Sequence, residues 1–250
     1  MNPSPYPAPF TSAHARATVV KILLVVGAVA AGLSLFAEAL TFAFPPLTDE
    51  QELTDNPFGT ALLFIVLLIA VFELIIYVAT VVVFLMWLYR AYNNLRAIGP
   101  GRRLDHSPGW AVASFFVPFA NLVIPYRAVK EVWQKSGPAH EAFLSEPGPP
   151  ARFPVWWMFW LLASFAGNIS MRVSFNDNVP PSTATMVSMI AGVTSIAAAV
   201  FAYLVVDAID KRQEEASGRA KLAPAGPPPP PAELMMRDVV TAPAQNISQT

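Results

Sequence analysis

The sequence predicts an all-α membrane protein with four transmembrane helices and a re-entrant or interfacial helical hairpin on the cytoplasmic side. Two observations lead to this fold class. Four long apolar stretches are separated by loops whose positive charge falls almost wholly on one side. Hydrophobic residues make up 54% of the 250 residues and charged residues only 13%, about half the share of a soluble domain. Because so few polar side chains are present, lipid must cover part of the surface.

Each of the four apolar stretches can cross about 30 Å of hydrocarbon, which takes roughly 20 residues of helix. Paired prolines at 45–46 and 180–181 follow the first stretch and precede the fourth. Pro154 suits the first turn of the third, where its missing N–H costs nothing. The second stretch is longer than the bilayer requires, so we expect it to tilt or to project into the cytoplasm. The predicted spans are 22–44, 60–88, 154–171 and 184–206.

A fifth apolar run, residues 110–126, is just long enough to cross but contains Pro118 and Pro125. The distribution of charge decides its placement. With four spans, 15 of the 16 Lys and Arg residues fall on the cytoplasmic side and only Arg172 lies outside. With five spans, seven lie inside and nine outside. The positive-inside rule therefore favours four spans, an inner (plasma) membrane location and cytoplasmic N- and C-termini.

The tryptophans predict an aromatic collar at the cytoplasmic interface. All six lie at or near that interface in this topology, and indole rings prefer that depth. Segment 108–134 would then re-enter the membrane or lie on its surface, with Arg127, Lys130 and Lys135 directed toward lipid headgroups. The six residues are Trp87, Trp110, Trp133, Trp156, Trp157 and Trp160.

The two ends of the chain differ in composition from the predicted membrane domain at 19–212. Residues 1–18 and 213–250 are rich in Pro or Ala, with an unbroken proline run at 227–231. Such segments cannot bury enough apolar surface to fold alone, so we expect disordered tails. The C-terminal tail offers contacts to protein partners. A net charge of −1 argues against nucleic acid, and the lack of Cys excludes disulfides and thiolate metal sites.

The segment after the second span carries the most specific sequence. It reads WLYRAYNNL from Trp87, SPGWAV from Ser107, FVPFANLVIPY from Phe116 and EVW from Glu131. This order and spacing resemble a bacterial membrane family known as domain of unknown function 4328, over roughly residues 60–210. The resemblance implies a multi-helix membrane domain and no activity, since the family has none assigned. The positions that carry it are Trp87, Arg90, Asn93, Asn94, Ser107, Pro108, Gly109, Trp110, Pro118, Asn121, Pro125, Glu131 and Trp133.

These motif residues have a physical interpretation as parts of the collar. Amides at the bilayer edge are costly when unpaired, so we expect the asparagines to hydrogen bond backbone groups freed by Pro118 and Pro125. Gly109 suits a tight turn that lifts Trp110 into the interface. A role in folding the collar is favoured over a ligand site, although the two are compatible. The asparagines concerned are Asn93, Asn94 and Asn121.

Glu73 is the strongest candidate for function, because an acid at the centre of a spanning helix costs about 2.5–3.5 kcal/mol on insertion scales. Tyr77 and Thr80 follow at i+4 and i+7, and we expect all three on one face. Two interpretations stay open. A protonated Glu73 could bind an ion or relay a proton, or it could simply join two helices through a hydroxyl. The hydroxyls considered are those of Ser164, Thr194 and Ser195.

A second set of polar residues lies near the outer ends of the predicted spans. Glu38 is in the outer part of the first span, and Asn168 and Arg172 lie at similar depth on the third. We expect a Glu38–Arg172 ion pair, since the lone external Arg would neutralise a costly acid. This pair fits a helix clamp better than a transport gate. Asp207 and Asp210, at the inner mouth of the fourth span, are expected to be solvated.

No motif of a soluble enzyme is present, since HExxH, P-loop, GxGxxG and GxSxG patterns are all missing. The histidines lack metal-ligand spacing, and His106 and His140 are expected in solvated loops, so we expect no metal and no cofactor. We favour a non-enzymatic membrane scaffold or regulatory module whose collar contacts the lipid bilayer and anionic headgroups. The alternative is a small transporter or channel using Glu73. A third class, a lipid-directed enzyme with Asp105, His106 and Glu131, lacks an evident nucleophile–base pair.

Overall fold

The structure, a computed structural model, describes residues 10–43, 57–99, 102–137 and 148–222. Within these ranges every regular element is a helix, which confirms the all-α prediction. The acidic outer loop, the proline run at 227–231 and His140 lie outside the described residues. In chain order the elements are α1 (His14–Ala43), α3 (Pro57–Ile98), α4 (Pro108–Ala113), the 3₁₀ helix η2 (Ala120–Leu122), α5 (Ile124–Lys135), α7 (Arg152–Ser174) and α8 (Pro181–Leu222).

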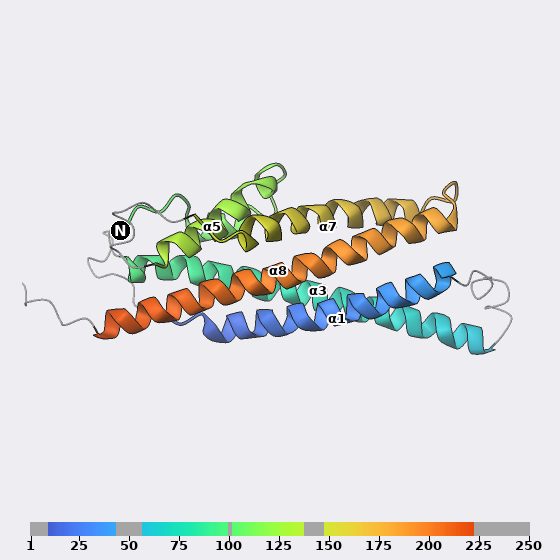
Figure 1. Ribbon diagram of the computed structural model, residues 1–250, viewed down its shortest axis with the longest axis horizontal. Helices are drawn as coiled ribbons and strands as arrows, with labels where there is room; N and C mark the ends of the chain where they lie inside the picture. Colours follow the sequence, from blue (N-terminus) through green and yellow to red (C-terminus); the bar gives the residue numbers. More distant parts are fainter. Residues whose placement is uncertain (1–9, 44–56, 100–101, 138–147, 223–250) are drawn as a thin grey trace, which may run out of the picture.

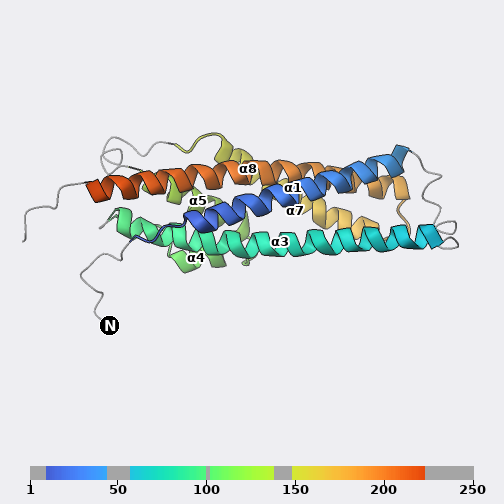
Figure 2. The ribbon, with the colours of Figure 1, turned by 90° about the horizontal axis from the view of Figure 1, so that it is seen from below.

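The four long helices run side by side along one axis (Figures 1 and 2). α8 packs against both α7 and α1, and α1 packs against α3. The short helices α4 and α5 fold back against α3, η2 packs against α5, and α5 also touches α7 and α8. They lie at the end of the bundle where α1 and α7 begin and where α3 and α8 end, and we call this the packed end (Figure 1).

In the part of the chain that the structure describes, three helices are long and apolar enough to cross a membrane: 14–40 in α1, 64–98 in α3 and 181–219 in α8. Large apolar side chains on these helices, such as Leu33 and Leu68, are exposed, as expected where lipid surrounds them. The protein is therefore a membrane protein. α7, which the sequence predicts as a fourth span, packs along α8 but is not among the three. Its three tryptophans and Asn168 lower its mean hydropathy.

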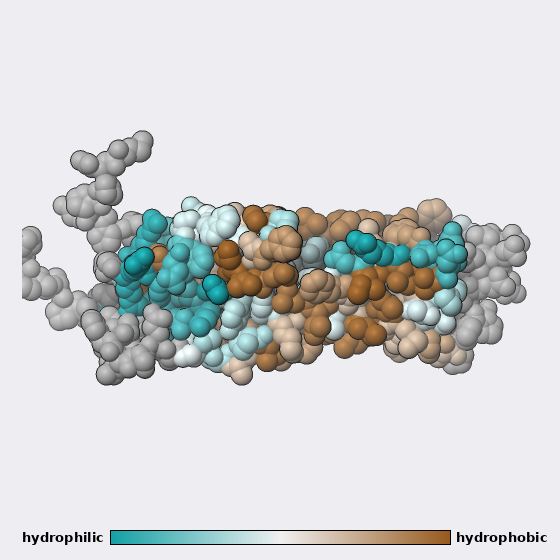
Figure 3. Space-filling view, turned by 90° about the horizontal axis from the view of Figure 1, so that it is seen from above, coloured by the Kyte–Doolittle hydropathy of each residue, from teal (hydrophilic) through white to brown (hydrophobic). Residues whose placement is uncertain are grey.

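The buried core lies at the packed end. There α1, α3, α5, α7 and α8 all contribute fully buried side chains, including Val20, Trp87, Val132, Phe153 and Ile209. Figure 3 shows hydrophilic residues gathered over this end, a broad hydrophobic band along the middle and a narrower hydrophilic strip toward the opposite end. The chain thus joins an apolar bundle to a compact polar and aromatic unit at the packed end, which we call the platform.

Two helices are longer than their apolar stretches. α3 and α8 each have 42 residues, about 63 Å of helix, or roughly twice the hydrocarbon thickness. α3 projects beyond its apolar part, which was one of the two predicted outcomes. α8 continues through 213–222, which the sequence assigned to a disordered tail, because Gln213 and Ser217 are buried in the platform. α1 likewise begins at His14, within the segment expected to be a tail.

The fifth apolar run does not form one straight helix. Ser107 caps α4, since its Oγ accepts a hydrogen bond from Trp110 N at 3.1 Å and a proline occupies the first turn. The predicted tight turn at Gly109 is therefore wrong, because Gly109 lies inside α4. Pro125 lies in the first turn of α5, and the chain between α4 and α5 turns through η2. The two prolines interrupt the run as predicted.

Candidate functional sites

A cluster of buried polar groups surrounds Glu131 in the platform. Glu131 is 4% exposed on α5, and its Oε1 accepts hydrogen bonds from Lys135 Nζ at 2.6 Å and from the backbone N of Asp105 at 2.7 Å. Its Oε2 accepts a hydrogen bond from the Tyr92 hydroxyl and lies 3.2 Å from His106 Nδ1. We call these five residues the Glu131 cluster.

The cluster holds Glu131 as a carboxylate. Burial alone would raise the pKa of Glu131, but hydrogen bonds from Lys135, Tyr92, Asp105 and His106 together hold the pKa below its usual value. Lys135 Nζ also donates to the Arg103 carbonyl at 2.6 Å. The carboxylate therefore fixes the segment after α3 onto α5, and both of its oxygens are occupied by donors.

The structure brings together Asp105, His106 and Glu131, the residues considered for a lipid-directed enzyme. His106 is not a solvated turn residue as predicted, because its ring lies against Glu131. Sequence reasoning missed Tyr92. The predicted direction of Lys135 toward lipid headgroups is wrong, because Lys135 is 9% exposed and its ammonium donates to Glu131. The i,i+4 spacing of Glu131 and Lys135 on one helix was the available signal for this contact. Because four groups contact the two oxygens of Glu131, its carboxylate joins α3, the segment after α3 and α5.

A second polar group ties the start of α1 to α8. His14 Nδ1 lies 2.9 Å from Asp210 Oδ2, and Lys21 Nζ lies 3.1 Å from Asp207 Oδ1 and 3.6 Å from Asp210 Oδ2. Asp210 is 4% exposed, so the prediction that it is solvated is wrong. The reason is that α1 extends past its apolar stretch and covers this part of α8.

Amides connect the same region to α3 and α5. Gln213 Nε2 donates to the Ala91 carbonyl at 2.8 Å and to Ser136 Oγ at 3.2 Å. Asn94, which is 2% exposed, accepts from the backbone N of Thr11 at 3.3 Å and donates to Gln213 at 3.4 Å. The prediction that Asn94 bonds backbone near the prolines is therefore wrong. The Asn94 side chain instead joins Thr11 and Gln213, which are far apart in the sequence. Asn93 is half-buried on the same helix.

Aromatic side chains of α5 and α7 pack together at the packed end. Trp157 stacks on Trp160 with ring centroids 4.6 Å apart, and its Nε1 donates to the Leu122 carbonyl at 3.1 Å. Trp133 packs edge-on against Phe153 and lies beneath the Arg212 guanidinium, 4.4 Å from the ring centroid. These contacts link η2 and α5 to α7 and α8. A collar at the cytoplasmic interface stays a prediction.

The remaining motif residues occupy different environments. Trp87 is fully buried, and Trp110 is 42% exposed. Arg90 is half-buried. Among the described residues, neither Trp87 Nε1 nor Asn121 Oδ1 has a hydrogen-bond partner. The expected bonding of Asn121 to freed backbone is therefore not found for its side-chain oxygen.

The segment between α4 and α5, residues 116–123, presents an apolar surface. Phe119 is 86% exposed and has φ of 63°, and it is the one non-glycine residue with positive φ in the described chain. Phe116 and Val123 are also exposed. We call this surface the hairpin tip, and it also includes Val117 and Leu122.

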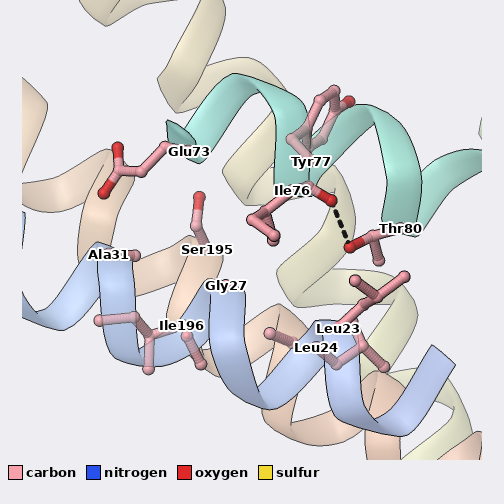
Figure 4. Close-up of a pocket in the computed structure, with 12 residues that line it drawn as sticks. Leu23, Leu24, Gly27, Ala31, Glu73, Ile76, Tyr77, Thr80, Ser195 and Ile196 are labelled. Atoms are coloured by element: carbon pink, nitrogen blue, oxygen red, sulfur yellow. Dashed lines mark hydrogen bonds between the residues drawn. The ribbon is translucent and has the colours of Figure 1, made fainter. Parts of the chain in front are cut away.

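A cavity of about 220 Å³ lies between α1, α3 and α8, within the apolar part of the bundle (Figure 4). Glu73 and Thr80 of α3 and Ser195 of α8 supply oxygen atoms to its wall. Small side chains create the space, because α1 contributes Gly27 and Ala31 where larger residues would fill it. Sequence reasoning identified the acid but not the cavity, since three helices have to be placed before the cavity exists.

The partner of Glu73 is Ser34 on α1, whose Oγ donates to Glu73 Oε1 at 2.6 Å. The predicted type of contact, a hydroxyl from another helix, is found, but the predicted donors are not the ones used. Thr80 donates to the Ile76 carbonyl at 2.6 Å. Tyr77 lines the same cavity as Glu73 and Thr80, but it is 67% exposed and its ring points away from Glu73 (Figure 4).

Toward the opposite end of the bundle, Glu38 accepts a hydrogen bond from Ser188 Oγ of α8 at 2.5 Å. Arg172 and Asn168 are exposed on α7, and Asn168 Nδ2 donates to the Ser164 carbonyl at 2.7 Å. The Glu38–Arg172 pair stays a prediction. Glu38 thus joins α1 to α8, while Glu73 joins α3 to α1.

The chain matches one protein family, described as a domain of unknown function (DUF4328), over residues 61–211. A search of curated proteins and a search of solved structures found no match. The matched residues include Glu73, the Glu131 cluster, the hairpin and most of α8, whereas α1 precedes them. Because the match covers more than half of the sequence, the chain belongs to the DUF4328 family.

Proposed function

We propose that the protein is a non-enzymatic membrane scaffold or regulatory module of the cell membrane. In this proposal α1, α3, α7 and α8 all span the bilayer, both termini lie in the cytoplasm, and the packed end forms a platform at the inner headgroups. The hairpin tip dips into lipid beside the bundle. Segments beyond the helices, including the Pro-rich C-terminal tail, contact protein partners.

The hairpin tip is the observation that carries this proposal. The backbone of Phe119, with φ of 63° and ψ of −43°, lies in a sparsely populated region that costs of order 1–3 kcal/mol, and its side chain is 86% exposed. In water nothing would offset that cost. In lipid, burial of a phenylalanine side chain contributes about 1.5–3 kcal/mol, which offsets it. The Glu131 cluster at the far end of α5 supplies a rigid support for such an insertion.

Basic residues near the hairpin support contact with anionic headgroups. Arg127 is exposed one turn into α5, Lys130 follows on the same helix, and Arg103 and Arg152 are exposed nearby in the platform. Near an anionic surface each such cation contributes about 1 kcal/mol. Trp110, partly exposed on α4, suits the same depth.

The natural absence of Cys makes a direct test possible, because single-Cys reporters need no background substitutions. Phe116→Cys and Phe119→Cys, each labelled with a polarity-sensitive fluorophore in liposomes, should show blue-shifted emission that lipid-borne quenchers reduce. Arg96→Cys, exposed at the end of α3, is the matched control and should report water. Water-like emission from both tip positions would contradict the proposal.

Topology and partners need separate measurements. Asp177→Cys, in the α7–α8 connection, and Asp105→Cys should react with a membrane-impermeant maleimide from opposite sides of the membrane if α7 spans it. Reaction from the same side would contradict a fourth span.

Deleting residues 223–250, beyond α8, should reduce crosslinked partners if the tail recruits them, and an unchanged crosslinking pattern would contradict that role.

A second candidate function is a small transporter or channel that uses Glu73. The cavity beside Glu73 favours it, because an acid next to an open space at mid-bundle is the arrangement that ion pathways use. Proton or cation flux into liposomes should occur with the wild-type chain and fall with Glu73→Gln. Absent flux, or flux unchanged by Glu73→Gln, would contradict this function.

A further inference from the structure

We propose that the cavity between α1, α3 and α8 is a proton-binding site, in which Glu73 carries the proton and Ser34 hydrogen bonds its carboxyl group. The inference deepens the second candidate function by naming the ion, and its test does not depend on flux. The reaction is reversible dissociation: a proton leaves the Glu73 carboxyl for water, and the carboxylate that remains accepts the Ser34 hydroxyl hydrogen bond. The observed Oγ–Oε1 distance of 2.6 Å fits that bond.

The composition of the cavity wall favours a proton over a metal cation. Hard cations in proteins take about six or more oxygen ligands in a closed shell. Here the wall is largely apolar and includes Leu24, Ile76 and Ile196, and the Thr80 hydroxyl donates to the Ile76 carbonyl of its own helix. Tyr77 points away. One carboxylate and the Ser195 hydroxyl cannot replace a cation's hydration shell, whereas a proton needs a single oxygen atom.

A second carboxyl extends the site along α1. Ser34 and Glu38 are four residues apart on α1, so their side chains lie on the same helix face about 6 Å apart along the axis. Glu38 in turn accepts from Ser188 of α8. Carboxyls and hydroxyls therefore alternate through Glu73, Ser34, Glu38 and Ser188 toward the end of the bundle away from the platform.

The test is chemical labelling of the carboxyl. Dicyclohexylcarbodiimide is soluble in lipid and reacts with protonated carboxyls in apolar surroundings, and mass spectrometry of the purified full-length protein locates the adduct. Glu73 should be labelled in acid, and labelling should fall about tenfold per pH unit above a midpoint. Ser34→Ala removes the donor to the carboxylate, so labelling of Glu73 at a fixed pH should increase.

Controls separate the site from general effects of substitution. Ser164→Ala changes a hydroxyl that bonds its own helix on α7, so the midpoint should stay unchanged. Glu38→Gln should slow proton exchange at Glu73 while leaving the equilibrium labelling in place. Three results would overturn the proposal: no adduct on Glu73 in acid, labelling independent of pH, or protection by sodium or potassium at fixed pH. Labelling as expected without flux would overturn the transport function and leave the proton site standing.

Discussion

Glu131→Gln tests whether the Glu131 cluster holds the platform together. The substitution keeps the size of the side chain but leaves the Lys135 ammonium, 9% exposed, without its carboxylate at 2.6 Å. Removing one partner of a buried ion pair costs about 3–5 kcal/mol. Lys135 retains the Arg103 carbonyl at 2.6 Å and Asp105 at 3.8 Å, so the cost should lie near the lower end, about 3 kcal/mol. The purified variant should therefore unfold roughly 6–12 °C below wild type when followed by circular dichroism.

The double variant Glu131→Gln/Lys135→Met gives a sharper result. Removing the unpaired ammonium as well should restore part of the stability, because an apolar pair of similar volume is often as stable as a buried ion pair. The pH dependence of unfolding gives an independent measurement. The pKa of Glu131 is lowered on folding. Its contribution to the free energy of unfolding is therefore complete above the unfolded pKa of about 4.3 and is lost as pH falls through the folded pKa. A loss below about 1 kcal/mol for Glu131→Gln, or no recovery in the double variant, would refute the reasoning.

Three further substitutions test other contacts of the platform. Gln213→Leu leaves a buried α3 carbonyl without the donor that lies 2.8 Å away and should cost about 1–3 kcal/mol in the same unfolding assay. Asp210→Asn weakens both pairs that bind the start of α1, so limited proteolysis should cleave that segment faster; unchanged cleavage would contradict the role of the pairs. Trp157→Phe keeps an aromatic ring but loses the bond to the Leu122 carbonyl at 3.1 Å, which should cost about 1 kcal/mol and increase hydrogen exchange around the hairpin.

Local sequence was sufficient for features that depend on one segment at a time. The all-α fold class followed from the long apolar runs. The break in the run 110–126 followed from Pro118 and Pro125, because proline lacks a backbone N–H donor in any fold. Glu73 stood out because an acid in an apolar helix is costly in any arrangement of neighbours. Helix ends were less well predicted, since polar residues such as Gln213 continue a helix only when another part of the protein buries them.

The sequence by itself determined that this is a membrane protein, that its long apolar segments are helical, and that Glu73 is the acid whose burial in a helix costs most. Only the tertiary structure decided which groups meet: Ser34 rather than a serine of α7 or α8 on Glu73, Ser188 on Glu38, and four donors around Glu131. The physical reason is that composition and periodicity report the depth and face of each residue within its own helix. The rotation and axial offset between helices arise from packing among segments far apart in the chain, and a shift of one residue exchanges one partner for another.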